Sequence, residues 1–366
     1  MSPIASSRET RQKIPKRKIR VLVVDDSAVA RKLITDALEE AGDIEVAGFA
    51  ADGYAACERV AVLKPDVLTL DIGMPGMDGI TFLKTVKGKN WVPAVVVSAI
   101  TSSGCQTALD ALRAGAVEVI SKPVDKTAYL DFRAVLPAKV RAAFACRQRV
   151  QGKPPATGVA NAITGTVSSL KLRVPAIIAI GSSTGGTEAV ETILRQMPGD
   201  CPGIVIAQHI PARFSLMFAE RLSHVCGIRV KEAASGDKVR PGLALIAPGD
   251  QHMTVRKCPG GFEAMVNQGP RVGFQRPSVD MLFQSVAEAA AADAIGAILT
   301  GMGNDGSAGL LAMKRARALT LAQDEASCAV FGMPKEAIRA GAVDHVLPLM
   351  QIAAALGSLH ARLQTR

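Results

Sequence analysis

Apolar runs rich in Val, Ile and Leu alternate with helical patterns along most of the chain, and this alternation constrains the fold more than any other feature. In the first part of the chain the runs are 19–24, 45–50, 67–70, 94–97 and 117–120. Helical patterns cover 27–40, 54–63 and 129–147. Runs that are apolar at nearly every position predict strands buried on both faces. Five such strands with helices between them predict a parallel α/β sheet covered on both sides.

A change in composition divides the chain into two α/β domains. Between 148 and 172 the chain is rich in Gly, Pro, Ser, Thr and Ala and shows no period, which is typical of a linker. After it, the apolar run 176–180 starts a second series of strands and helices. We therefore expect a leader over 1–18, one domain over 19–147, the linker, and a second domain over 173–362.

The net charge of +10 is concentrated in the leader. Residues 1–20 contain seven basic side chains and one acidic side chain, so they supply most of the excess. A basic, Ser- and Pro-containing segment of this kind predicts a solvated, disordered arm, and docking of the arm on an acidic partner is the alternative. We expect no nucleic-acid partner, because the rest of the chain carries little net charge.

The sequence shows no sign of secretion or of a membrane span. No apolar segment precedes Ile19, and no run approaches the roughly 18 apolar residues that cross a bilayer. The seven cysteines are scattered and form no C-x-x-C motif. This pattern predicts a reduced, cytoplasmic protein without a zinc site.

Three carboxylates in the first domain follow predicted strands. Asp25 and Asp26 come after the first strand, and Asp71 comes after the third. Because the carboxyl ends of parallel strands meet at one edge of a sheet, these groups predict a Mg²⁺ site there. Ser98 ends the fourth strand and Lys122 follows the fifth, so a hydroxyl and an ammonium would complete a pocket for a phosphoryl group. The alternative is that each aspartate only caps the helix that follows it.

On these residues, 18–145 resembles a response-regulator receiver domain. The motifs that carry the resemblance are Val23-Val24-Asp25-Asp26-Ser27, Leu70-Asp71-Ile72-Gly73-Met74-Pro75-Gly76-Met77-Asp78-Gly79, Ser98 and Lys122-Pro123. The resemblance implies a flavodoxin-like (βα)5 fold, phosphorylation of Asp71 by a sensor histidine kinase, and Mg²⁺ bound by Asp25, Asp26 and Asp71.

The same resemblance implies roles for Ser98 and Lys122, and two positions depart from its pattern. Ser98 would move toward the phosphoryl group, Lys122 would pair with it, and the Lys122–Pro123 bond would be cis. Gly73 replaces a side chain that is often polar or acidic. Val119 stands where many receivers carry a switching aromatic residue, a departure that concerns the usual rotamer-coupled switch and not phosphorylation itself.

The second domain opens with a candidate nucleophile. The sequence Gly181-Ser182-Ser183-Thr184-Gly185 follows the run 176–180 and precedes a helical pattern. It matches G-x-S-x-G, in which a serine sits at a strand-to-helix turn beside backbone N–H groups that can stabilise an oxyanion. A phosphate-binding turn is the alternative for such a short pattern.

A serine nucleophile needs a base, and five histidines are available. His209 directly follows the strand-like run 204–208, which should bring it to the same sheet edge as Ser183. His252, expected in a loop, is the main rival. The others are His224 in a helical stretch, His345 near a strand end and His360 in the last helix.

Asp305 is the candidate that would orient the base. It follows the apolar run 294–299, within a segment that also matches G-x-G-x-x-G through Gly301, Gly303 and Gly306. With Asp324 further on, the match suggests a dinucleotide site. We disfavour that interpretation because the match lies late in its domain and Asp305 occupies a variable position of the turn.

Residues 175–357 resemble the catalytic domain of CheB-type chemotaxis protein-glutamate methylesterases. The motifs are Ile180-Gly181-Ser182-Ser183-Thr184-Gly185-Gly186-Thr187-Glu188, Gln208-His209-Ile210-Pro211, Ala247-Pro248-Gly249-Asp250-Gln251-His252-Met253, Arg276-Pro277-Ser278-Val279-Asp280, Thr300-Gly301-Met302-Gly303-Asn304-Asp305-Gly306 and Val330-Phe331-Gly332-Met333-Pro334. The resemblance implies a Rossmann-like doubly wound fold, a triad of Ser183, His209 and Asp305, and oxyanion stabilisation near Thr184 and the Met302 N–H. The chain order Ser, His, Asp differs from that of α/β-hydrolases.

The two resemblances together imply a phosphorylation-activated hydrolase. Its substrates would be glutamyl γ-methyl esters on the cytoplasmic helices of chemoreceptors, and it would also deamidate receptor glutamines. The phosphodonor would be a sensor histidine kinase of the CheA type, Mg²⁺ would serve the receiver, and the esterase would need no cofactor. We expect the unphosphorylated receiver to cover Ser183. The alternatives are a DNA-binding response regulator, which would need a helix-turn-helix, and a nicotinamide-dependent reductase.

Overall fold

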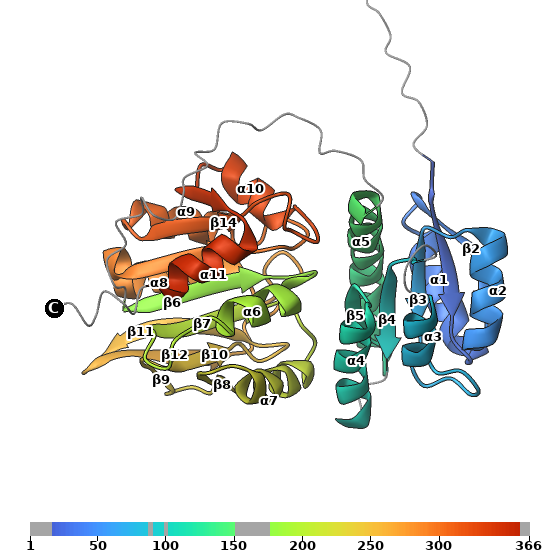
Figure 1. Ribbon diagram of the computed structural model, residues 1–366, viewed down its shortest axis with the longest axis horizontal. Helices are drawn as coiled ribbons and strands as arrows, with labels where there is room; N and C mark the ends of the chain where they lie inside the picture. The colour runs from blue at the N-terminus through green and yellow to red at the C-terminus, as the bar shows by residue number, and fades with distance from the viewer. Residues whose placement is uncertain (1–16, 87–90, 99–101, 151–175, 359–366) are drawn as a thin grey trace, which may run out of the picture.

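The computed structural model describes residues 17–86, 91–98, 102–150 and 176–358. Most of the predicted leader and linker, and His360, lie outside these residues. The described chain forms a first unit over 17–150 and a second unit over 176–358 (Figure 1). The domain limits given above remain a prediction.

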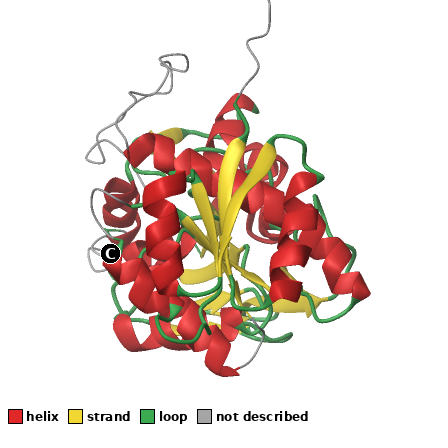
Figure 2. Cartoon of the chain, turned by 90° about the vertical axis from the view of Figure 1, so that its right-hand side faces the viewer, coloured by secondary structure: helices red, strands yellow, loops and turns green. Residues whose placement is uncertain are grey.

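The first unit is a five-stranded parallel sheet between two layers of helices (Figures 1 and 2). Its strands are β1 (Ile19–Val24), β2 (Ile44–Ala50), β3 (Val67–Leu70), β4 (Ala94–Ser98) and β5 (Glu118–Ser121). Its helices are α1 (Ala28–Glu39), α2 (Gly53–Leu63), α3 (Gly79–Thr85), α4 (Ser102–Ala114) and α5 (Lys126–Val150). The strand order β2-β1-β3-β4-β5 confirms the expected flavodoxin-like fold.

The sequence did not predict α3 and α4. Helix α3 has only seven residues, too few to display a period of 3.6, and it begins because the Asp78 carboxylate accepts hydrogen bonds from the N–H groups of Ile80 and Thr81. Helix α4 starts with small and polar residues, which hide its apolar face from a periodicity search.

The second unit is built on a seven-stranded sheet whose strands are all parallel. In sheet order the strands are β15 (His345–Leu347), β14 (Leu319–Gln323), β13 (Ala294–Ile298), β6 (Ile177–Ser182), β7 (Gly203–Gln208), β10 (Leu243–Ile246) and β8 (Arg229–Glu232). The helices are α6 (Gly186–Leu194), α7 (Phe214–Val225), α8 (Val279–Ala290), α9 (Ser307–Arg315), α10 (Met333–Arg339) and α11 (Leu349–Gly357). A small antiparallel sheet contains β9 (Lys238–Val239), β11 (His252–Cys258) and β12 (Gly261–Asn267).

The strand order places the site of the second unit. The chain starts in the centre with β6, builds outward through β7, and returns to the other side of β6 with β13. A doubly wound sheet binds its ligands beyond the carboxyl ends of the strands, at the point where the order reverses. The expected Rossmann-like architecture is confirmed, and this point lies between β6 and β13.

Helix α8 packs directly on the backbone of β6. A Cβ atom added to Gly181 would lie 2.1 Å from Val279 Cγ1 and 3.0 Å from Phe283 Cζ. Both of these side chains are fully buried. Only glycine allows the helix to come this close, so α8 begins beside the end of β6.

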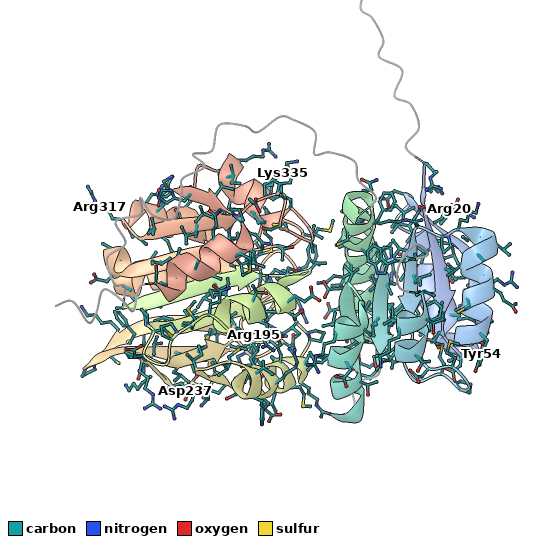
Figure 3. The ribbon with its side chains drawn as sticks, viewed as in Figure 1. Arg20, Tyr54, Arg195, Asp237, Arg317 and Lys335 are labelled. Atoms are coloured by element: carbon teal, nitrogen blue, oxygen red, sulfur yellow. The ribbon has the colours of Figure 1, made fainter. Side chains whose placement is uncertain are left out.

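The two units face each other through α4, β5 and α5 of the first unit (Figure 1). Ala142 and Cys146 of α5 form a small apolar cluster with Val330 of the second unit. Side chains of both units meet along this boundary, whereas Tyr54 and Arg317 point outward on opposite sides (Figure 3). In the described parts of the chain, no helix is long and apolar enough to cross a membrane.

The close contact at Gly181 predicts a stability effect. Gly181→Ala should lower the free energy of unfolding of the second unit by about 1–3 kcal/mol, because its methyl group would force Val279 out of place. Thermal or urea unfolding checks this value. Gly227→Ala is the matched control, since its Cβ would meet only an ordinary contact at 3.8 Å. Equal stability of the two variants would contradict the packing argument.

Candidate functional site

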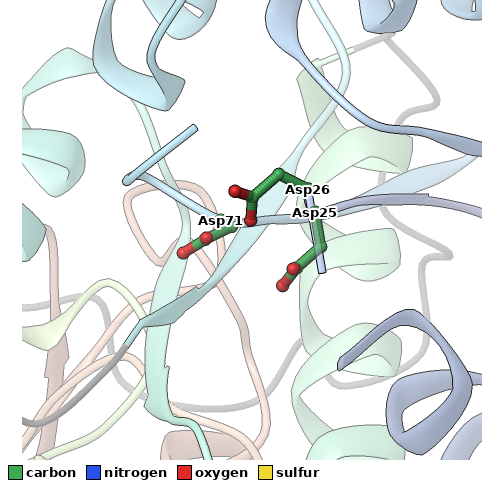
Figure 4. A group of neighbouring side chains, drawn as sticks. All are labelled: Asp25, Asp26 and Asp71. Carbon is green, nitrogen blue, oxygen red and sulfur yellow. The ribbon is translucent and has the colours of Figure 1, made fainter. Parts of the chain in front are cut away.

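The acidic cluster of the first unit is assembled at the carboxyl ends of β1 and β3. Carboxylate oxygens of Asp25, Asp26 and Asp71 lie within 4.8 Å of one another (Figure 4). Asp25 and Asp71 are buried and Asp26 is exposed. Ser27 caps α1, so neither aspartate before it serves as that cap. Carboxylate oxygens that converge at a partly exposed edge of the sheet fit a hard divalent cation such as Mg²⁺.

Lys122 links two of these carboxylates. Its Nζ lies 2.8 Å from Asp25 Oδ2 and 2.9 Å from Asp71 Oδ2. Burial raises the pKa of Asp25 although the ammonium opposes this, whereas burial lowers the pKa of Lys122 but its two carboxylate partners raise it above its usual value. Lys122 therefore stays charged and offsets part of the negative charge of the cluster.

Ser98 lies next to Lys122, but one expectation at this site is wrong. The Lys122 N–H donates to the Ser98 carbonyl oxygen at 2.8 Å, which brings both residues to the same sheet edge. In the described chain the cis peptide bond is Arg276–Pro277. The Lys122–Pro123 bond is trans, so the expectation of a cis bond there is wrong. The two isomers of an X–Pro bond differ by only about 0.5–1 kcal/mol, so local sequence alone does not decide between them.

In the second unit, hydrogen bonds fix the turn that carries Ser183. Ser182 Oγ donates to Gln208 Oε1 at 2.6 Å, and Gln208 Nε2 donates to the Ser183 carbonyl oxygen at 2.9 Å. The Ser183 N–H donates to Thr300 O at 3.0 Å, so it is not available to an oxyanion. A Cβ atom on Gly301 would lie 2.8 Å from Ser183 Cβ, which explains the glycine there.

His209 and Asp305 are joined directly. His209 Nε2 lies 2.7 Å from Asp305 Oδ2, and both residues are buried. Among the described residues, His209 Nδ1 has no hydrogen-bond partner. The imidazole therefore shares its Nε2 proton with the carboxylate and keeps Nδ1 as the acceptor. Ser183 and His209 line the same small cavity. In the described part of the chain, no hydrogen bond joins their side chains.

The amino terminus of α8 holds the Asp305 carboxylate. Ser278 Oγ donates to Oδ1 at 2.8 Å, and the N–H groups of Val279 and Asp280 donate to Oδ2 and Oδ1 at 2.7 and 3.0 Å. Burial raises the pKa of Asp305, but His209 and these backbone donors lower it by a larger amount, so the pKa lies below its ordinary value. The carboxylate is therefore charged near neutral pH.

Ser278, part of the motif Arg276-Pro277-Ser278-Val279-Asp280, also contributes to the site. It is the N-cap of α8, and its Oγ also accepts from the Met281 N–H at 3.4 Å. A serine directly before an apolar helical run is a recognisable cap signal. That signal could have identified the cap, but its contact with Asp305 depends on the fold.

His252 plays a structural part behind this cap. It was expected in a loop, but it is the first residue of β11 and is fully buried. Its Nδ1 accepts from the Ser278 N–H at 3.2 Å, and its Nε2 donates to the Pro270 carbonyl oxygen at 2.9 Å. Both ring nitrogens are used, so His252 is not available as a base and the choice between the two histidines favours His209.

The glycines that suggested a dinucleotide site have conformational or packing roles in the turn. Gly303 and Gly306 have φ of 93° and 94°, a conformation that favours glycine, and a Cβ on Gly306 would lie 2.6 Å from Val279 Cγ1. Asp324 accepts from the N–H and the hydroxyl of Ser327 and so closes its own turn. These contacts account for the pattern without a ribose.

The first unit covers Ser183, the candidate nucleophile. Glu118 of β5 accepts a hydrogen bond from Thr184 Oγ1 at 2.6 Å, and the same oxygen, Oε2, binds Lys139 Nζ at 2.7 Å. The cavity shared by Ser183 and His209 has a volume of about 10 Å³ and is also lined by Leu112, Val117, Glu118 and Val119 of the first unit. A space of this size holds about one water molecule.

The two residues expected to stabilise an oxyanion lie at this boundary. The Thr184 carbonyl oxygen accepts from Thr300 Oγ1 at 2.9 Å, which fixes the turn after Ser183. Met302 packs against the apolar cluster that α5 forms with Val330.

The sequence alone did not identify Glu118 as part of this boundary. Nothing local to β5 indicates its contact with Thr184, a residue 66 positions away.

Comparisons with known proteins match both units. The response regulator receiver domain family matches residues 21–131, and the CheB methylesterase family matches residues 178–356. A protein-glutamate methylesterase/protein-glutamine glutaminase of Syntrophus aciditrophicus is 49% identical over 92% of this chain and 97% of that protein. One from Pseudomonas savastanoi is 46% identical over 93% and 98%.

Among solved structures, the CheB methylesterase catalytic domain of Thermotoga maritima is 37% identical and covers 50% of this chain and 98% of that one, with a TM-score of 0.49. The relatives matched over nearly their whole length decide the family. This chain belongs to the protein-glutamate methylesterase/protein-glutamine glutaminase family, with a response-regulator receiver followed by a CheB methylesterase domain.

Proposed function

We propose that this protein is a phosphorylation-activated chemotaxis methylesterase. It hydrolyses glutamyl γ-methyl esters on chemoreceptors to glutamate and methanol, and it deamidates receptor glutamines by the same route. The observation that carries the proposal is the buried His209–Asp305 pair beside Ser183, in a chain whose relatives are named for both activities. An ester and a primary amide present the same carbonyl carbon to a nucleophile.

In the proposed reaction, Ser183 Oγ attacks the ester carbonyl carbon while His209 Nδ1 takes its proton. Asp305 stabilises the imidazolium through the 2.7 Å contact at Nε2. The backbone N–H groups of Thr184 and Met302 would bind the oxyanion. His209 then gives its proton to the departing methanol, and water attacks the acyl-enzyme by the same steps in reverse. These steps need no cofactor.

The receiver supplies the control. Asp71 accepts a phosphoryl group from a sensor histidine kinase of the CheA type, and Asp25, Asp26 and Asp71 would hold Mg²⁺. The ion, when bound, offsets charge on the phosphoryl oxygens. Lys122 already contacts two of the carboxylates and would pair with the phosphoryl group, and Ser98 would move toward it.

Access to Ser183 depends on the receiver. A cavity of about 10 Å³ cannot admit a glutamyl ester, so the arrangement described here is the inhibited one. Phosphorylation of Asp71 shifts the population to a state in which β5 and α5 have left the catalytic turn. Val119 lies at this boundary and lines the covered cavity, so an apolar side chain there contributes to the cover.

The proposed setting is the cytoplasm, where the receptor's signalling helices and the kinase are found. The thiols of Cys57, Cys201, Cys226 and Cys258 are free, which suits a reducing compartment. A DNA-binding output would need a helix-turn-helix, whereas the second unit is a seven-stranded α/β sheet.

Removal of the nucleophile tests the activity. Ser183→Ala should lower kcat for methanol release by several orders of magnitude, about 10⁴-fold or more, because a triad acts as a unit. The measurement uses the full chain, methylated receptor membranes and a small-molecule phosphodonor. Thermal unfolding confirms that the variant is folded. Methanol release near the wild-type rate would exclude a serine mechanism.

The role of Ser278 is open to a matched test. Ser278→Ala should lower kcat about tenfold and move the acid limb of the pH–rate profile upward, because Asp305 would lose a donor and hold the His209 proton more tightly. Ser278→Thr should restore most of the rate. Ser285→Ala is the control on the same helix: it removes a hydroxyl that, among the described residues, bonds to Val255 and Leu282 and not to Asp305. An unchanged profile in Ser278→Ala, or the same shift in Ser285→Ala, would argue for a purely structural serine.

Phosphorylation control predicts the behaviour of Asp71→Asn. This variant should lose the stimulation by phosphodonor and keep the low basal rate. Asp52→Asn is the control, since Asp52 caps α2 and asparagine caps equally well. The fragment from Pro175 onward should be more active than the unphosphorylated full chain. A fragment of equal or lower activity counts against inhibition by the receiver.

A further inference from the structure

Helix α5 contacts the second unit along one of its faces. Near one end, Asp131 Oδ2 lies 3.3 Å from Arg271 Nη2. Near the other end, Cys146 Sγ donates to the Ala329 carbonyl oxygen at 3.3 Å. Lys139 lies between them, eight residues from one contact and seven from the other. Residues about two turns apart share a helix face, so α5 lies lengthwise across the boundary.

Glu118 places a glutamate side chain beside the nucleophile. Its carboxylate accepts from Thr184 Oγ1, one residue after Ser183, and lines the cavity that Ser183 and His209 share. The reaction proposed above leaves a glutamate side chain on a helix at this same place. Glu118 with α5 therefore has the chemistry of the product, presented to the site by the receiver.

The charges at the boundary agree with this assignment. The receiver contributes two carboxylates, and the second unit contributes their partners. Asp131 pairs with the Arg271 guanidinium, and Glu118 accepts a hydrogen bond from the Thr184 hydroxyl. A substrate helix that bears several glutamates and their esters has the same complementarity. When the receiver leaves, Arg271 loses Asp131 and becomes available to such a helix.

Arg271 is prepared for this exchange. Its Nη2 also lies 2.7 Å from Asp250 Oδ1, and the same oxygen accepts from Arg276. The guanidinium is thus held at the boundary between the two units, with its side chain 34% exposed. A guanidinium that is positioned in advance loses little freedom when it binds a carboxylate.

We propose that α5 and Glu118 occupy the place of the substrate helix and its glutamate, and that Arg271 binds a carboxylate of the substrate. This inference rests on the proposed function. Asp131 and Lys139 are eight residues apart, about 12 Å along a helix. The carboxylate that Arg271 binds should therefore lie about two helical turns from the esterified glutamate, on the same face of the substrate helix.

Two variants that break the same ion pair from opposite sides test the inference. In the unphosphorylated full chain at saturating methylated receptor membranes, Arg271→Gln and Asp131→Asn should each raise methanol release by up to about fivefold, the range of an exposed pair. In the phosphorylated chain, Arg271→Gln should raise KM for methylated receptor membranes about three- to tenfold with little change in kcat. Asp131→Asn should leave that KM unchanged, and Arg271→Lys should restore most of it.

The outcomes separate the two levels of the argument. If Arg271→Gln shows the wild-type KM, or if Asp131→Asn raises KM equally, Arg271 does not bind the substrate and the inference fails. If the phosphorylated wild-type chain releases no methanol, the proposed function itself fails. In the wild-type enzyme, KM should rise when the receptor's acidic residues two helical turns from the ester are replaced by glutamine. In Arg271→Gln, the same replacement in the receptor should leave KM unchanged. Persistence of the rise in that variant would equally overturn the inference.

Discussion

The second unit depends on one buried carboxylate at the start of one helix. At the amino end of α8, Asp305 accepts hydrogen bonds from two backbone N–H groups and from the Ser278 hydroxyl. It also contacts His209 Nε2 through Oδ2. Burial alone would favour a neutral carboxyl group, and these donors reverse that preference. The same helix can reach the site only because Gly181 lets it approach β6 closely. Packing of the core and alignment of the histidine are therefore one structural requirement.

Much of the fold was predictable because it rests on local patterns. Apolar runs located the strands, and strand ends brought Asp25, Asp71 and Lys122 to one edge of the first sheet. The same reasoning placed His209 and Asp305 at the edge that carries Ser183, and they lie 2.7 Å apart. The short helix α3 escaped prediction because seven residues are too few to show a period.

The remaining features depend on contacts between distant segments. Glu118 reads as an ordinary strand residue until the second unit supplies Thr184 as its partner. His252 and His209 could not be separated by residue type, since only the bonds to Ser278 and Pro270 show that His252 has no free nitrogen. The proline isomer at Pro123 is similarly undetermined by its neighbours, because the two forms are close in free energy.

The position of Lys139 affects how much free energy the proposed switch requires. Lys139 and Glu118 belong to the same unit, 2.7 Å apart, so the ion pair travels with the receiver when the units separate. Departure thus breaks the Thr184 hydroxyl bond, the exposed Asp131–Arg271 pair and the Cys146–Ala329 bond. It strands no buried charge, which would otherwise cost about 3–5 kcal/mol. In the proposed mechanism the closed and open forms are then close in free energy, and a single phosphoryl group on Asp71 would reverse their order. Dephosphorylation would return the enzyme to rest as readily.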